Sequence, residues 1–187
     1  MTRESGYLRS TDMDLVEKAR GGDPSAFHEL VDRYAGSLFG LAVSLSGNAA
    51  DAEDMLQETF TGAFRGLGAF EGRSSVKTWL TRILIRQRAR HWRSTHRGKA
   101  ATLSIEEAPD SSVATPSSHA ATDARIDVTA AIKSLSPDHR EVIALREMQG
   151  LSYDEIADIL EIPRGTVESR LFRARRELQE RLREYLV

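Results

Sequence analysis

Three carboxylates that could in principle bind a metal ion, Asp51, Glu53 and Asp54, lie close together in the sequence. Magnesium-dependent nucleases use such groups. The other signs of an enzyme are missing: there is no nucleophile motif or phosphate-binding loop, and the chain has no cysteine. His91 and His96 are too isolated to indicate a metal site. We therefore expect no catalytic site, no metal and no cofactor, with a nuclease as the weaker alternative.

Charged residues are segregated along the chain, although the formal net charge is only −2. Residues 12–63 include ten acidic and three basic side chains, whereas residues 65–99 include ten basic side chains and one acid, Glu71. Residues 164–183 carry seven arginines. Two basic stretches in a nearly neutral protein indicate two contact points on a polyanion. On charge alone, two solvated helix faces remain the alternative.

Apolar residues recur at helical spacing and no segment alternates as a strand would, so the sequence predicts an all-α protein. Residues 98–123 are rich in Ala, Ser, Thr and Pro and poor in large apolar side chains, which predicts a flexible linker. Two small helical domains, 1–97 and 124–187, are expected on either side of it. The helices expected in the first domain are 12–20, one that starts near residue 24 and continues or restarts as far as residue 45, 51–67 and 76–93.

The N-terminal segment, residues 1–11, lacks the apolar core of a secretory signal. No stretch approaches the roughly 18 apolar residues of a membrane span. We therefore expect a soluble, cytoplasmic protein.

The second domain contains the pattern of a helix-turn-helix. Residues 152–155, Ser-Tyr-Asp-Glu, form a capping box that opens a short helix, whose inner face we expect to be Ile156, Ala157 and Leu160. Glu161 and Ile162 form the expected turn, and a proline follows at the start of the next helix. A short helix, a tight turn and a longer helix are typical of DNA-binding proteins.

The longer helix can be phased at about 100° per residue. Its inward sector is Val167, Leu171, Ala174 and Leu178, and its outward side carries arginines together with Phe172. Outward arginines can bond guanine edges or phosphates, and the aromatic ring suits a thymine methyl group. An ordinary helical hairpin with a solubilising arginine surface is the alternative.

Four stretches then resemble the sigma factors of bacterial RNA polymerase. Residues 51–60, DAEDMLQETF, resemble conserved region 2.2, and residues 70–80, FEGRSSVKTWL, resemble the loop and helix that follow it. Residues 23–27 resemble the start of region 2.1, and residues 165–175 resemble the recognition helix of region 4. They occur in family order, and regions 1.1 and 3 of the larger sigma factors have no counterpart. The chain therefore resembles the extracytoplasmic-function (ECF) group of the sigma-70 family.

The resemblance implies a protein that binds core RNA polymerase, melts the −10 promoter element and reads the −35 element. It implies that Asp54, Gln57 and Glu58 contact the clamp helices of the largest polymerase subunit. The residues implied for −10 DNA are Phe70, Arg73, Ser74, Ser75, Lys77, Arg82, Arg86 and Arg93. Those implied for −35 DNA are Arg164, Gly165, Thr166, Glu168, Ser169, Arg170, Phe172, Arg173 and Arg176. Family members commonly bind an anti-sigma factor, which can hold them at the membrane, so such a partner is expected.

Some positions depart from the family pattern. Arg86 stands where asparagine is frequent, Arg90 where aspartate is frequent, and Glu168 where a basic residue is frequent. These departures concern promoter sequence rather than the class of protein. A conventional regulator that uses the helix-turn-helix without the polymerase is the main rival, and it would leave Gln57 and Glu58 unexplained.

Overall fold

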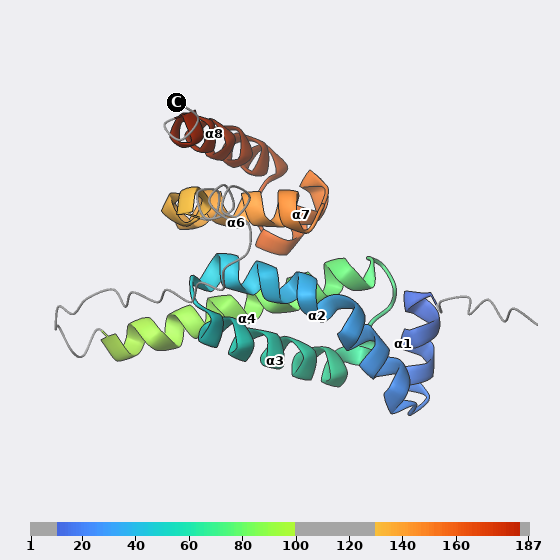
Figure 1. Cartoon of the computed structure of the whole chain (residues 1–187). Helices are drawn as coiled ribbons and strands as arrows, with labels where there is room; N and C mark the ends of the chain where they lie inside the picture. The colour runs from blue at the N-terminus through green and yellow to red at the C-terminus, as the bar shows by residue number, and fades with distance from the viewer. Residues whose placement is uncertain (1–10, 100–129, 184–187) are drawn as a thin grey trace, which may run out of the picture.

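The computed structural model describes residues 11–99 and 130–183, with side chains described only as far as residue 88 in the first range. Every regular element in these residues is helical, which confirms the all-α prediction (Figure 1). Nearly all of the predicted linker lies outside the described residues. The N-terminal group consists of α1 (Asp12–Arg20), α2 (Pro24–Ser46), α3 (Ala49–Gly66), the 3-10 turn η1 (Leu67–Ala69) and α4 (Val76–Lys99). The C-terminal group consists of a helical segment at 130–134, α6 (Pro137–Ile143), the π-helical turn η2 (Ala144–Met148), α7 (Tyr153–Leu160) and α8 (Arg164–Arg183).

Local capping explains where the N-terminal helices begin. The side chain of Thr11 accepts a hydrogen bond from the amide of Asp14, whose carboxylate accepts one from the Thr11 amide, so α1 starts with a capping box. Asp23 caps α2, which runs unbroken to Gly47 at φ 87°. The possible restart within α2 does not occur, because no residue before Gly47 breaks the helix.

The core of the N-terminal group lies between α2, α3 and α4. Leu41 on α2, Met55 on α3 and Leu84 on α4 are buried in one cluster. Trp79 is only partly buried and packs against that cluster. Helix α1 lies across one end and buries Leu15 against α2. The result is a scaffold that fixes the outer faces of α3 and α4.

The core of the C-terminal group is formed by α6, α7 and α8. Val167, Leu171 and Ala174 are buried on α8, as the phasing predicted. The inner face predicted for α7 needs a correction: Ile156 and Ile159 are buried, whereas Ala157 and Leu160 are half-buried. Ile159 belongs inside because α8 and η2 both pack on this short helix.

The two groups of helices pack against each other. Figure 1 shows α6 and α7 above α2 and α4, with α3 on the far side of the N-terminal group. Contacts between the groups join α2 to α6 and η2, and α4 to α7. Nothing in the sequence predicted this packing.

Candidate polymerase and nucleic-acid interfaces

The outer face of α3 carries the three residues expected to contact polymerase. Asp54, Gln57 and Glu58 are all exposed, and no described residue forms a hydrogen bond or ion pair with their side chains. They lie three and four residues apart, so they share one side of the helix. The arrangement leaves an acidic, hydrogen-bonding surface that would repel DNA and suits a protein partner.

One residue of this face, Phe64, was missed by the sequence analysis. It lies seven residues after Gln57, on the same side of α3, and 59% of it is exposed. Its ring packs edge-on against Phe27 of α2, with 5.1 Å between the ring centroids. The available signal was its phase, because Met55, Thr59 and Ala63 define the buried stripe and Phe64 falls outside it.

Asp51 lies at the start of the same helix but has a structural partner. Its amide donates to the side chain of Asn48, and its carboxylate accepts from the amide group of Asn48 at 2.8 Å. No group of three His, Asp or Glu side chains in the parts of the chain that the structure describes could hold a metal ion. The geometry therefore adds nothing to the nuclease alternative.

The loop between η1 and α4 contains the residues expected to meet the −10 element. Phe70 is buried and its ring packs against Trp79, with 4.6 Å between centroids, so in this conformation it supports the loop from inside. Arg73 is highly exposed and pairs with Glu71 at 3.2 Å. The hydroxyl of Ser75 accepts from the amide of Thr78 at the start of α4, which gives this serine a capping role.

The cations expected along α4 differ in their surroundings. Lys77 donates to the backbone carbonyl of Gln149 at 2.5 Å, and exposed Arg86 lies 3.4 Å from Glu161. Arg82 is half-buried, and its Nε has no hydrogen-bond partner among the described residues. The side chain of Arg93 is not among those that the structure describes.

The helix-turn-helix begins with the predicted capping box. The hydroxyl of Ser152 accepts from the amide of Glu155, and the Glu155 carboxylate accepts from the Ser152 amide at 2.9 Å. The hydrogen bond from the Ser152 backbone, followed by smaller contributions such as that of Thr78, lowers the pKa of Glu155. Glu161 ends α7 in the left-handed conformation at φ 56°, which turns the chain into α8.

The outer face of α8 presents the residues expected to read the −35 element. Phe172 is 69% exposed, and Arg173 is exposed with no described ion-pair partner. Most other arginines of this helix are paired: Arg164 with Asp154 and Glu168, Arg170 with Asp138, Arg175 with Glu147, and Arg176 with Glu180. Ser169 is exposed and its hydroxyl donates to the carbonyl of Thr166. Gly165 is exposed, and a Cβ added there would meet open space.

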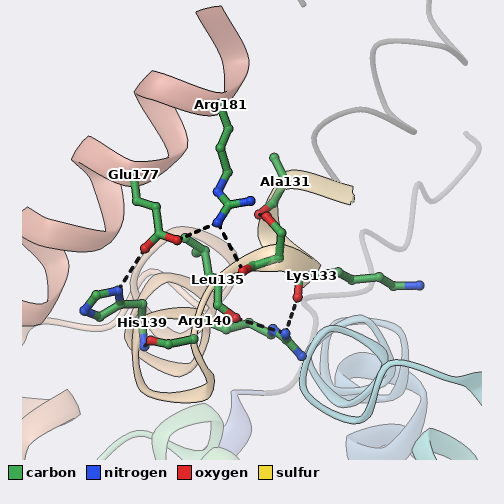
Figure 2. Close-up of polar contacts among 9 residues, drawn as sticks. Ala131, Lys133, Leu135, His139, Arg140, Glu177 and Arg181 are labelled. Atoms are coloured by element: carbon green, nitrogen blue, oxygen red, sulfur yellow. Dashed lines mark hydrogen bonds and ion pairs between the residues drawn. The ribbon is translucent and has the colours of Figure 1, made fainter. Parts of the chain in front are cut away.

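The far end of α8 is fixed by a polar cluster. In Figure 2, Glu177 lies between Arg181, which donates to it at 2.8 Å, and His139, 3.2 Å away. Hydrogen bonds from these two partners, Arg181 first, lower the pKa of the Glu177 carboxyl. Arg140 donates to the carbonyls of Lys133 and Leu135. The contact of Glu177 with His139 joins α8 to α6, and the Arg140 hydrogen bonds join α6 to the segment before it.

Comparison with known proteins identifies the family. Residues 30–98 match Sigma-70 region 2, and residues 125–178 match Sigma-70, region 4. The RNA polymerase sigma-H factor of Pseudomonas aeruginosa is 37% identical, over 94% of this chain and 95% of that protein. The ECF RNA polymerase sigma-E factor of Escherichia coli K12 is 36% identical, over 92% of this chain and 94% of that protein. The chain belongs to the ECF group of the sigma-70 family.

Two solved structures share the fold of this sigma factor. RpoE of Bartonella quintana, in complex with the anti-sigma factor NepR, has a TM-score of 0.70 and 31% identity, covering 84% of this chain and 96% of that chain. CnrH, in complex with the cytosolic domain of CnrY, has a TM-score of 0.68 and 27% identity, covering 94% of this chain and 99% of that one.

Membership settles the general activity. As a sigma factor, the protein directs promoter-specific initiation by RNA polymerase, and the relatives above are initiation factors rather than enzymes. The region 2 match also argues against a conventional helix-turn-helix regulator, because such a regulator would not account for the N-terminal group. In the part of the chain that the structure describes, no helix is long and apolar enough to cross a membrane.

Proposed function

We propose that this sigma factor divides its work between three helix faces: α3 binds the polymerase, α4 and the loop before it open the −10 element, and α8 reads the −35 element. The observation that carries this proposal is the separation of charge within one small scaffold. The exposed face of α3 is acidic, whereas α4 and the outer face of α8 are rich in arginine. A protein partner and a polyanion would therefore meet different sides of the molecule.

On α3, Asp54, Gln57 and Glu58 would contact the clamp helices of the largest polymerase subunit. Their side chains have no partner among the described residues, so binding breaks none of the described contacts. Phe64 extends the same face and supplies an exposed aromatic surface, the type of residue that often dominates binding energy.

The −10 surface would combine loop and helix. Opening a duplex costs a few kcal/mol per unstacked base, which contacts with the separated strand must return. Arg73 and Ser74 on the loop and Lys77, Arg82, Arg86 and Arg93 on α4 would supply these contacts. Phe70 and Ser75 would support them, since one is buried behind the loop and the other caps the helix.

The −35 surface would be centred on Arg173 and Phe172. Arg173 has no ion-pair partner among the described residues and could form two hydrogen bonds to a guanine edge. The exposed ring of Phe172 could contact a thymine methyl group. Glu168 pairs with Arg164, which also pairs with Asp154. These two carboxylates partly neutralise the positive charge at the N-terminal end of α8. The remaining residues of this face would position the helix on the sugar-phosphate backbone of the DNA: Arg164, Gly165, Thr166, Ser169, Arg170 and Arg176.

We propose domain limits of 1–97 and 124–187, with residues 98–123 as the tether that lets both DNA readers act on one promoter. An anti-sigma factor is a further proposed partner, because a solved neighbour is described in complex with one. The proposed compartment is the cytoplasm, where polymerase and chromosome meet.

Permanganate footprinting on a promoter that this sigma factor activates tests the division of work. Permanganate reports unpaired thymines at −10, and DNase protection reports occupancy at −35. Arg82→Ala with Arg86→Ala should lower permanganate reactivity and leave −35 protection in place. Arg173→Ala should weaken −35 protection by about 1–3 kcal/mol. Loss of both signals in each variant would contradict the assignment.

A further inference from the structure

Helix α1 belongs to none of the three surfaces assigned above, and it lies before the residues that match Sigma-70 region 2, which begin at residue 30. It packs on α2 and on η1 at one end of the N-terminal group, where the chain passes from η1 to α4 (Figure 1). The connection between η1 and α4, residues 70–75, is the −10 loop to which we assign part of the −10 surface. Two side chains of α1 contact this part of the chain.

Met13 lies directly against the −10 loop. A Cβ added to Gly72 would be 3.2 Å from the terminal methyl carbon of Met13 and 3.7 Å from its sulfur. Gly72 has φ 71°, a left-handed conformation that glycine adopts readily, and its lack of a side chain lets the thioether approach the backbone. Met13 is 41% exposed, so this apolar contact is made at the surface and not in the core.

Arg20 holds the segment that leads into the −10 loop. Its Nε donates a hydrogen bond of 2.9 Å to the backbone carbonyl of Leu67, the first residue of η1. Its Nη1 donates to the carboxylate of Glu17, one turn earlier on α1, at 2.8 Å, which orients the guanidinium. Hydrogen bonds from a charged donor are stronger than those between neutral groups. Helix α1 therefore holds the chain at two points, Leu67 and Gly72.

The helix that makes these two contacts is itself anchored to α2. The carboxylate of Asp12 accepts hydrogen bonds from Arg33, at 2.5 Å, and from the hydroxyl of Tyr34. Leu15 and Val16 are buried on the inner side of α1. Polar and apolar contacts thus fix α1 on the same scaffold that carries α3 and α4, so its contacts restrain the loop relative to that scaffold.

We propose that α1 is a brace for the −10 loop: Met13 and Arg20 are positioning residues that hold the loop in the shape in which Arg73 and Ser74 meet the unpaired strand. The inference rests on the proposed function of this loop. A loop that already has its binding shape loses less conformational entropy when the strand binds. The brace therefore favours opening of the −10 element and contributes to neither polymerase binding nor −35 recognition.

Truncation of Met13 tests the brace in the complete complex of core polymerase, sigma factor and promoter. Met13→Ala removes the contact with Gly72, whereas Met13→Leu keeps a carbon near the position of the sulfur. Lys18→Ala is the matched control, because it truncates another exposed side chain of α1, one that forms no hydrogen bond or ion pair with a described residue. The rate at which thymines at −10 become reactive to permanganate measures opening.

We expect Met13→Ala to slow opening about threefold to tenfold, the range expected for a residue that acts through a neighbour. Arg20→Ala should act in the same direction, Met13→Leu should restore most of the rate, and Lys18→Ala should match the wild type. DNase protection at −35 and the melting temperature of the free Met13→Ala protein should stay close to the wild-type values, because a surface side chain is removed.

A double-mutant cycle shows whether Met13 acts through the loop. Arg73→Ala with Ser74→Ala removes the loop side chains that would meet the strand, whereas Arg86→Ala removes a cation of α4 outside the loop. Met13→Ala should have little further effect in the loop variant and its full effect in Arg86→Ala, because residues that act as one unit are not additive. A general loss of stability would slow opening equally in both backgrounds.

Equal losses in the two backgrounds would overturn the brace. Wild-type opening by Met13→Ala, with slow opening by the Arg73 and Ser74 double variant, would also overturn it and would leave the proposed function of the loop standing. Wild-type opening by that double variant would instead refute the proposed function of the loop, and the brace with it.

Discussion

Two neighbouring residues of α8 separate stability from recognition. Leu171 is 1% exposed and Phe172 is 69% exposed. Phe172→Ala should change the free energy of unfolding by less than about 0.5 kcal/mol, because little packing is lost, yet weaken binding to −35 duplex. Leu171→Ala should cost about 2–5 kcal/mol of stability. Chemical denaturation and electrophoretic mobility shifts measure the two effects, and a large loss of stability in Phe172→Ala would contradict the exposed placement.

Glu155 gives a pH dependence with a defined sign. The hydrogen bond from Ser152, helped by that from Thr78, lowers the pKa of this carboxyl below its ordinary 4.5. Its contribution to stability is therefore complete above the unfolded pKa and is lost as the pH falls through the lower, folded pKa. The difference in melting temperature between wild type and Glu155→Gln should be largest near neutral pH and shrink below about pH 4.5. A difference that does not change with pH would contradict this role.

At the scale of elements, capping residues made the helix limits predictable. Helix α1 begins at the capping box of Thr11 and ends before Gly21 and Gly22, so the predicted range 12–20 is confirmed. Helix α4 extends to Lys99, beyond the expected end at residue 93, because no proline interrupts it and Gly98 falls only at its last turn. On α7 the exposed and buried sides were partly misassigned, since a short helix leaves few residues to set its phase. That inner face depends on two packing neighbours, α8 and η2, and propensity alone does not contain this information.

The turn between α7 and α8 offers a stabilising substitution. Glu161 is the one non-glycine residue with positive φ in the part of the chain that the structure describes. The left-handed conformation costs an ordinary residue roughly 1–2 kcal/mol. Glu161→Gly should raise the free energy of unfolding of the C-terminal domain by about 1 kcal/mol relative to Glu161→Ala, which loses the same carboxylate but keeps Cβ. Equal stability of these two variants in denaturant titrations would show that the turn is unstrained.

For the whole molecule, the sequence predicted the parts and missed their packing. Charge segregation predicted separate acidic and basic surfaces, and the motifs predicted the family. The contact between Ser37 and Gln149 joins residues 112 positions apart, and a single glutamine carries no local sign of such a partner. Phe64 was missed although its phase places it outside the buried stripe of α3. The contact between Ser37 and Gln149, by contrast, is decided by which surfaces meet in three dimensions.

Run-off transcription with purified core polymerase on a pool of genomic promoters tests the central claim most directly. The protein should produce new, selective transcripts, and Gln57→Ala with Glu58→Ala should abolish them because the α3 face then no longer holds the polymerase. Glu29→Ala with Asp32→Ala, which alters exposed residues of α2 outside every assigned surface, should leave the transcripts unchanged. Selective transcripts that persist at full level in the Gln57 and Glu58 double variant would contradict the account.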